Sequence, residues 1–286
     1  LNGVCAMGGT VKAEAKRRAV HRCRARHPKA SPVDCGESGS TLRFSCPVFA
    51  DPRHRSDVCR SRQTSRAPYR RLHRPSAAAR RNGRDCRGLP FHITGKLQSG
   101  DFRVPGNISS QFITGLLFAL PLLKKDSTVT LTTPLESKGY IDLTIEVLAG
   151  FGVKIEETET GWHICGGQTY RAEHYTVEGD WSQAAFFLSE AAVSGGPIRL
   201  LGLSETSLQG DKACVHLWRQ FGLSVTEETA FMLPKQNTDK PYRGLHGIAI
   251  NAAQIPDMVP ALAVTAAFAE GETVISPCGA IALKGV

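Results

Sequence analysis

Three polar segments of the sequence are suited to binding an anion. Residues 109–111, Ser-Ser-Gln, stand immediately before an apolar run, and Ser137 precedes a second such run. Residues 36–41 form a glycine-rich turn of the kind that lets a ligand approach the backbone. The first N–H groups of a helix lack partners and lie at its positive end, so helix starts bind phosphates. The alternative at each position is ordinary capping by Ser or Thr.

One carboxylate is suited to proton transfer. Asp257 lies in Ile-Pro-Asp-Met-Val-Pro, at the start of a predicted helix with few other polar groups nearby. A carboxylate in such a setting can serve as a proton acceptor. The alternative is an N-cap, the commonest role of Asp at a helix start. Asp180 has the same position in Glu-Gly-Asp-Trp, and we interpret it as structural.

A repeated pattern of elements positions these residues. A first type of helix begins at a polar cap, continues as an apolar run and is followed by a short β-rich run. The helices are predicted at 109–123, 180–193 and 257–269, and the β-rich runs at 129–133, 198–203 and 273–276.

A second type of helix alternates with the first and ends in Phe-Gly. It is predicted at 140–153 and 212–225, where Gly152 and Gly222 should stop the helices. A strand pair follows each helix, at 154–166 and 226–234. Corresponding positions are separated by 70 to 77 residues. Strands alternating with helices predict an α/β fold of repeated βαβαββ units with partly parallel sheets.

The pattern is interrupted at residues 45–88, an arginine-rich stretch without apolar periodicity. A disordered basic insertion is one interpretation. The spacing of the repeat is preserved across the stretch, however, which favours a reading-frame shift in the coding sequence. Residues 11–30 are similarly basic, and a genuine basic helix is the alternative there. The pattern resumes at 89–97.

Charge and cysteine content also divide the chain. Residues 1–88 carry a net charge of +15 and six of the nine cysteines, and residues 89–286 carry −6. An odd number of cysteines without a close Cys-x-x-Cys pair argues against a disulfide framework and against a zinc site. The sequence shows neither a membrane-spanning run nor a signal peptide, so we expect a cytoplasmic protein that does not bind a membrane.

Five segments between residues 104 and 271 carry recognisable motifs: VPGNISSQFITGLLFALPLL, ESKGYIDLTIEVLAGFGV, VEGDWSQAAFFL, LQGD and IPDMVPALAVTAAFAEG. Together they resemble the 5-enolpyruvylshikimate-3-phosphate synthase family, the 3-phosphoshikimate 1-carboxyvinyltransferases of chorismate and aromatic amino-acid biosynthesis. DCGESGSTLRF (34–44) resembles the family's phosphoenolpyruvate-side turn. The resemblance covers about 33–44 and 89–278.

The resemblance implies the enolpyruvyl transferase fold, with two similar domains closing on shikimate-3-phosphate and phosphoenolpyruvate. The expected division is a non-matching segment at 1–32, a first domain at 33–178 and part of a second at 179–286. No metal or organic cofactor is implied, and a monomer is expected. The implied substrate contacts are Ser109, Ser110, Gln111, Ser137, Gly39 and Lys284, with Asp257 as the catalytic residue beside the substrate 5-hydroxyl.

Departures from the family pattern predict weak activity. An expected Lys-Ser-x-x-x-Arg motif is absent, and the basic stretch replaces an Arg-Pro-Ile motif. At 278–286, Ala280 and Gly285 stand where the family has Asn and Glu, and the chain stops before further cationic contacts. Each lost charge-stabilising group costs orders of magnitude, so we expect little or no turnover and, since only part of the second domain is present, some tendency to associate.

Two alternatives remain at this stage. The related UDP-N-acetylglucosamine enolpyruvyl transferases share the fold and the chemistry, although the Ser-Ser-Gln and Ser-Lys-x-Tyr motifs favour the shikimate enzyme. A second alternative is a non-catalytic protein that binds nucleic acid through a basic N-terminal arm. The basic stretch has few aromatic residues and no recognisable module, so we expect no specific nucleic-acid binding.

Overall fold

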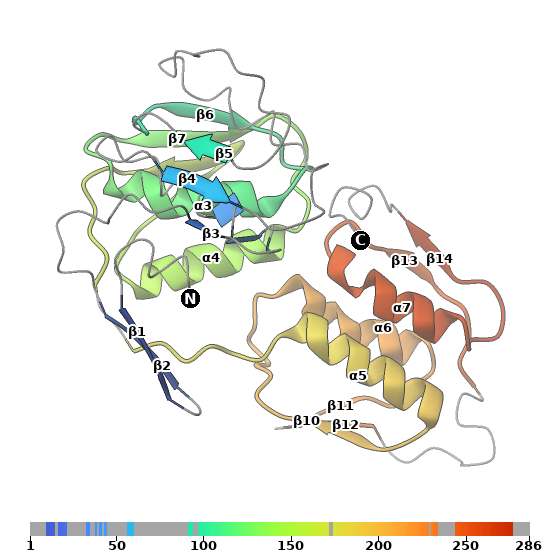
Figure 1. The fold of residues 1–286 in the computed structure, drawn as a ribbon. Helices are drawn as coiled ribbons and strands as arrows, with labels where there is room; N and C mark the ends of the chain where they lie inside the picture. Colours follow the sequence, from blue (N-terminus) through green and yellow to red (C-terminus); the bar gives the residue numbers. More distant parts are fainter. Residues whose placement is uncertain are drawn as a thin grey trace.

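The computed structural model describes residues 10–14, 17–21, 33–34, 38, 40–41, 43–44, 56–59, 91–93, 97–171, 174–228, 230–233 and 244–276. Two lobes, each with a hydrophobic core of its own, contain most of these residues (Figure 1). The first core is built from residues between Phe102 and Ile164, and the second from residues between Trp181 and Leu262. The extended segment 174–180 leads from one lobe to the other.

The first lobe has a four-stranded sheet in the order β6-β7-β9-β8. Strands β6 and β7 are parallel, and the other two pairs are antiparallel. The register places Phe102, Val129 and Trp162 in one row across the sheet, and all three are buried. Helices α3 and α4 lie on this side (Figure 1). The elements are β6 (Asp101–Val104), α3 (Ser110–Ala119), η2 (Leu120–Leu122), β7 (Ser127–Leu131), α4 (Lys138–Gly150), β8 (Glu156–Thr158) and β9 (Gly161–Ile164).

The second lobe packs three helices against one another, with small sheets at two sides (Figure 1). The buried side chains of Trp181, Trp218 and Leu262, one from each helix, meet in its core. Its elements are α5 (Trp181–Ser194), β10 (Ile198–Leu200), η3 (Gly210–Ala213), α6 (Cys214–Gln220), β11 (Thr226–Glu228), β12 (Ala230–Leu233), β13 (Ala249–Asn251), η4 (Pro256–Met258), α7 (Val259–Ala266) and β14 (Val274–Ser276).

The predicted repeat is present in both lobes. Each of the five predicted helices and both strand pairs occur within a few residues of their expected bounds. Gly152 and Gly222 follow α4 and α6 with φ of +82° and +107°, the left-handed conformation that ends a helix. The sheets are partly parallel, because β6 pairs with β7 and β13 with β14 in parallel. The α/β prediction is therefore confirmed.

The N-terminal third contributes strands that the sequence pattern did not predict. β1 (Thr10–Glu14) and β2 (Arg17–His21) form an antiparallel hairpin, so the alternative of a basic helix at 11–30 is wrong for these residues. β4 (Ser56–Cys59), inside the arginine-rich stretch, lies between β3 (Val33–Asp34) and β5 (Phe91–Ile93) in a three-stranded sheet. The rest of 45–88 and all of 279–286 lie outside the described residues.

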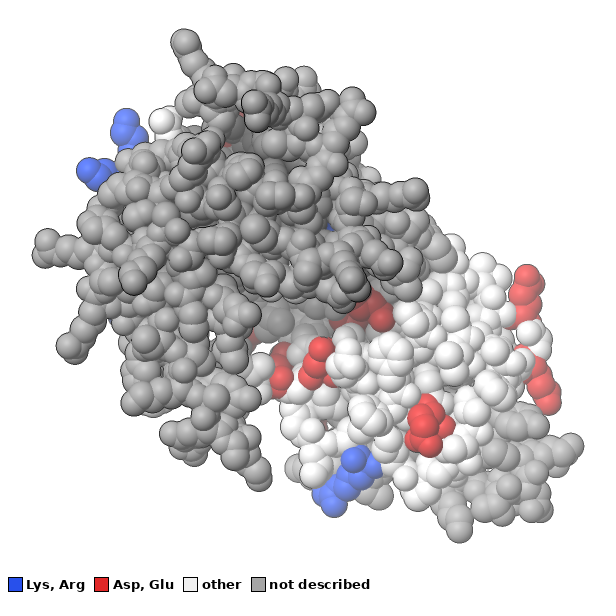
Figure 2. Space-filling view, viewed as in Figure 1, with Lys and Arg blue, Asp and Glu red and all other residues white. Residues whose placement is uncertain are grey.

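The outer side of α5 and α7 is unusually apolar. Phe186 and Phe187 on α5, Val264 on α7 and Phe268 just after it are each 42–54% exposed. The described surface in this part of Figure 2 is mostly uncharged, with a few acidic side chains. No helix in the described part of the chain is both long and apolar enough to cross a membrane.

Candidate functional site

A tyrosine of the first lobe lies between two carboxylates of the second. Tyr140 Oη, on α4, is 2.5 Å from Asp211 Oδ2 on η3 and 3.0 Å from Asp257 Oδ2 on η4. A phenol has only one proton, so it can donate to only one carboxylate at a time. Asp211 is fully buried, whereas Asp257 is exposed. The arrangement therefore concentrates negative charge around one shared proton, with one carboxylate facing solvent.

Tyr140 keeps its proton in this setting. Burial is the main cause that raises its pKa well above the ordinary value, and the negative charges of Asp211 and Asp257 raise it further. The phenol is therefore a permanent hydrogen-bond donor at neutral pH, and it links the first lobe to this pair of carboxylates of the second lobe.

The lobes approach each other closely beside Tyr140. A Cβ atom added to Gly139 would lie 2.7 Å from Gly210 N and 2.8 Å from Leu208 O, so no larger residue fits there without a shift of the backbone. Gln254 of the second lobe reinforces the contact. Its Oε1 accepts from Lys138 N at 2.8 Å, and its Nε2 donates to Leu135 O at 3.0 Å. The start of α4 is thus fixed against the second lobe by the Gln254 side chain and by the close approach at Gly139.

Ser137 stands at the N-cap position of α4 in an unusual conformation. Its φ of 58° is left-handed, a conformation that costs a non-glycine residue roughly 1–2 kcal/mol. Within the described residues its hydroxyl makes no capping hydrogen bond, although the side chain is buried. Ordinary capping therefore does not explain this serine.

The start of α3 carries a linked set of polar side chains. Ser109 caps the helix, because its Oγ accepts from Gln111 N at 3.4 Å. Gln111 Oε1 accepts from Arg43 at 2.9 Å, and Gln111 Nε2 donates to Ser40 Oγ at 2.8 Å. Arg43 also lies over the ring of Phe112, and its buried Nε has no hydrogen-bond partner among the described residues. A cationic group thus stands beside the helix start that the sequence marks as an anion site.

The starts of α3 and α4 are neighbours. The loop before α3 is hydrogen-bonded to the loop before α4, because Gly106 N donates to Thr133 Oγ1 at 2.9 Å and Glu136 N donates to Gly106 O at 3.1 Å. A Cβ at Gly106 would lie within 3 Å of this second loop. Two positive helix ends consequently lie side by side at one edge of the first lobe.

The comparisons with known proteins indicate a single family. The family model for EPSP synthase, 3-phosphoshikimate 1-carboxyvinyltransferase, matches residues 1–284. The chain belongs to the EPSP synthase family. This membership confirms the resemblance, and the match also runs across the stretches at 1–32 and 45–88 in which no family motif is recognisable.

Individual relatives support the same assignment. The 3-phosphoshikimate 1-carboxyvinyltransferase of Clostridium perfringens is 41% identical over 243 residues, which are 84% of this chain and 56% of that protein. The enzyme of the same name from Clostridioides difficile is 41% identical over 257 residues, 88% of this chain and 56% of that protein. The chain spans a little over half the length of these relatives.

Solved structures show the fold. The EPSP synthase of Acinetobacter baumannii superposes with a TM-score of 0.73 at 23% identity, covering 98% of this chain and 64% of that one. At this level of identity the similarity establishes the enolpyruvyl transferase fold alone.

The structure describes most of the predicted site residues of this EPSP synthase family member. Ser109 and Gln111 meet at α3, Ser110 is the first residue of that helix, Ser137 is at the start of α4, and Asp257 is at η4. Gly39 and Lys284 lie outside the described residues.

Four further residues of the site did not emerge from the sequence patterns. Tyr140 stands in the quoted Ser-Lys-x-Tyr motif and Asp211 in Leu-Gln-Gly-Asp, so both were visible without a role. Arg43 stands in the quoted segment at 34–44, again without a role, and Gln254 lies outside every quoted segment; their partners are 68 and 116 residues away in the chain.

Proposed function

We propose that this chain carries the site at which the enolpyruvyl group of phosphoenolpyruvate is transferred to the 5-hydroxyl of shikimate-3-phosphate. In the proposed reaction the hydroxyl oxygen bonds to C2 of phosphoenolpyruvate while C3 takes a proton. Phosphate then leaves C2 and C3 loses a proton, which restores the double bond. The observation that carries the proposal is the convergence of Tyr140, Asp211 and Asp257 beside the starts of α3 and α4.

Asp257 is the proposed proton acceptor. Its carboxylate is exposed, so a substrate hydroxyl can reach it, and the hydrogen bond from Tyr140 fixes its orientation. The fully buried Asp211 competes for the same phenolic proton. When Asp257 takes a proton from the substrate, one of the two neighbouring negative charges is neutralised. Tyr140 can then donate its hydrogen bond to Asp211 alone, which favours the transfer of the proton to Asp257.

The phosphate of shikimate-3-phosphate is the proposed ligand of the two helix starts. Ser109, Ser110 and Ser137 offer hydroxyls there, at the positive ends of α3 and α4. The left-handed backbone of Ser137 and its hydroxyl without a capping bond fit a residue held ready for a ligand.

Phosphoenolpyruvate is the proposed neighbour of Gln111 and Arg43. Gln111 is fixed by two side-chain hydrogen bonds, and Arg43 supplies a positive charge for a phosphate or a carboxylate. Gly39 and Lys284 complete this half of the site in our proposal.

We further propose that the lobes correspond to the domains at 33–178 and 179–286.

We expect low turnover, because the family motifs Lys-Ser-x-x-x-Arg and Arg-Pro-Ile are absent from the sequence. The proposal nevertheless predicts that the chain binds its substrate. The test is isothermal titration of the purified chain with shikimate-3-phosphate and, separately, with UDP-N-acetylglucosamine. We expect binding of shikimate-3-phosphate, weakened about tenfold or more when both Ser109 and Ser110 are replaced by Ala.

The matched control is Ser194→Ala, at the far end of α5, which should leave the affinity unchanged. Binding of the UDP-sugar without binding of shikimate-3-phosphate would contradict the proposal and favour the related enzyme class. Rapid formation of product from both substrates would show that the expected loss of turnover is wrong.

A further inference from the structure

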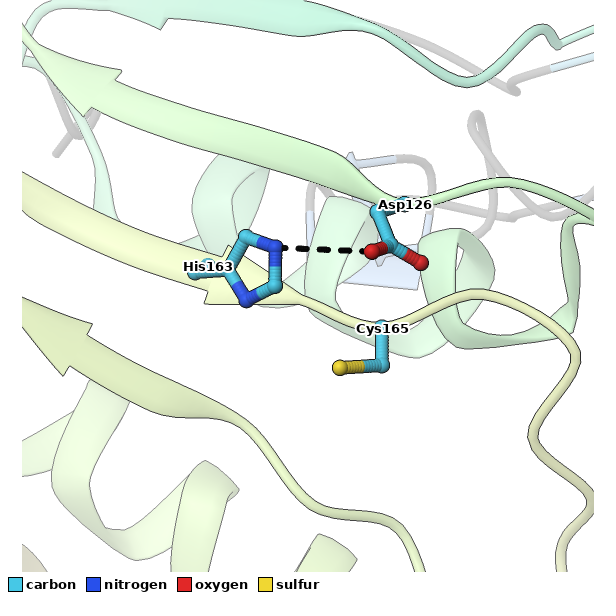
Figure 3. A group of neighbouring side chains, drawn as sticks. All are labelled: Asp126, His163 and Cys165. Carbon is cyan, nitrogen blue, oxygen red and sulfur yellow. Dashed lines mark ion pairs between the residues drawn. The ribbon is translucent and has the colours of Figure 1, made fainter.

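Asp126, His163 and Cys165 form a cluster in the first lobe, and none of them belongs to the site described above (Figure 3). One potential metal-ligating atom from each residue lies within 4.8 Å of the other two. His163 Nε2 is 3.7 Å from Asp126 Oδ2. The histidine is partly exposed and the other two residues are exposed, so an ion from solution can reach all three.

The sheet brings these residues together by its register. Trp162 and Ile164 of β9 are buried against the helices, so His163 between them points to the opposite side, and Cys165 continues that alternation. Ser127 of β7 pairs with Ile164, which places Asp126 opposite Cys165 on the neighbouring strand. The three side chains therefore share one face across two strands.

Neighbouring groups orient two of the three ligands. Asp126 Oδ1 accepts from Gly166 N at 2.9 Å, which leaves Oδ2 toward His163. His163 Nδ1 is 3.5 Å from Glu156 Oε2 on β8. The Glu156 carboxylate is thus placed to hold a proton on Nδ1 when Nε2 binds a metal ion, as carboxylates beside metal-binding histidines do.

Imidazole nitrogen, thiolate sulfur and carboxylate oxygen are the ligands that Zn²⁺ takes in proteins, and in a tetrahedral site they lie about 3.3–3.8 Å apart. The 3.7 Å between His163 Nε2 and Asp126 Oδ2 falls in that range. Since all three ligand atoms lie within 4.8 Å of one another, Cys165 Sγ has to move by at most about 1 Å to complete the set. A hard ion such as Mg²⁺ prefers oxygen ligands, which disfavours it here.

We propose that Asp126, His163 and Cys165 bind a divalent transition metal of the zinc class. The thiol of Cys165 gives up its proton to solvent on binding, and water completes the coordination. The absence of Cys-x-x-Cys motifs does not count against such a site, because its ligands come from two strands that are paired in space and separated by some 40 residues in the chain.

Peptide-resolved alkylation tests the proposal in the full chain. The reduced, metal-free protein is treated with iodoacetamide with and without Zn²⁺, and modification of each cysteine is measured by mass spectrometry. We expect Zn²⁺ to slow the modification of Cys165 by about tenfold or more. His163→Gln and Asp126→Asn should each remove most of that protection. His216→Gln, an exposed histidine on α6, is the matched control and should retain it.

A second measurement uses Co²⁺ as a spectroscopic probe. Cobalt bound to the thiolate should give a sulfur-to-metal charge-transfer band that is lost in Cys165→Ser, while circular dichroism shows the variant to be folded. Equal alkylation of Cys165 with and without Zn²⁺ would overturn the proposal. Protection that persists in both His163→Gln and Asp126→Asn would also overturn it, since the metal would then be held elsewhere.

Discussion

The starts of α5 and of η4 carry the same sequence signal and use it differently. Both have an aspartate before an apolar helical run, 77 residues apart in the repeat. Asp180 turns its carboxylate onto its own helix, where Oδ1 accepts from Ser182 N at 2.8 Å and from Gln183 N at 3.3 Å. Asp257 instead accepts from Tyr140 of the other lobe, and η4 has no side-chain cap among the described residues. One aspartate stabilises a helix, and the other is available for chemistry.

The largest expected effect is a loss of ligand affinity, which should occur on replacing Asp257 and not on replacing Asp180. Asp257→Ala should weaken the binding of shikimate-3-phosphate by about 10–100-fold, because a hydrogen bond to a charged partner is lost. Its melting temperature should stay near that of the parent, since the carboxylate caps no helix. Titration calorimetry measures the affinity, and Asp180→Ala is the control. Equal affinities for parent and Asp257→Ala would contradict the proposed role.

The second prediction removes the tyrosine that makes Asp257 different. Tyr140→Phe leaves Asp211 buried without its phenolic donor, so the free energy of unfolding should fall by about 1–3 kcal/mol. Chemical denaturation measures this loss. A variant as stable as the parent would show that the shared proton contributes nothing to the fold.

The stability difference between the parent and Tyr140→Phe should depend on pH. The pKa of Tyr140 is raised in the folded state from its ordinary value of 10.0, first by burial and then by the two carboxylates. The protonated phenol is therefore favoured by folding, and its contribution is complete below about pH 10 and declines as the pH rises above it. The difference in stability between parent and Tyr140→Phe should shrink above pH 10. A constant difference would contradict this.

The third prediction concerns the structural aspartate. Asp180→Ala should lower stability by about 1 kcal/mol, or roughly 2–4 °C in melting temperature, because two N–H groups of α5 lose their acceptor. Asp180→Asn should recover most of the loss, since Asn caps nearly as well. The affinity for shikimate-3-phosphate should not change in either variant. A clear loss of affinity would remove the distinction between the two helix starts.

The smallest expected effect tests strain at Ser137. Ser137→Gly should raise stability by up to about 1 kcal/mol, because glycine adopts the φ of 58° without steric cost. It should also weaken substrate binding through loss of the hydroxyl. Ser137→Ala keeps the strain and loses the same hydroxyl, so it should bind as weakly without the gain in stability. Unchanged affinity in both variants would assign Ser137 a purely structural role.

Much of the fold could be predicted from the sequence because its signals are local. The apolar periodicity of residues 140–153 and the glycine at 152 predicted a helix and its end, and α4 ends at Gly150 with Gly152 left-handed. Asp180 was interpreted as structural, and its carboxylate caps α5. The strands β1, β2 and β4 gave no such signal, because basic segments lack the alternation that marks a strand against a core.

The candidate site was only partly predictable. Family motifs indicated Asp257 and the serines at the helix starts, yet they assigned no partner to Asp257 and no role to Asp211. The pair depends on a contact between residues 117 positions apart, which no local pattern encodes. Gln254 and Arg43 entered the site for the same reason.

The sequence by itself determined the repeat, the order of its elements, most helix ends and membership of a family, since each of these follows from neighbouring residues or from shared motifs. Only the tertiary structure decided that Tyr140 joins two carboxylates and that Asp126 meets His163 and Cys165. Helix capping acts within a few residues, whereas a shared proton or a shared metal needs side chains that only the packing of lobes and strands brings within a few ångströms.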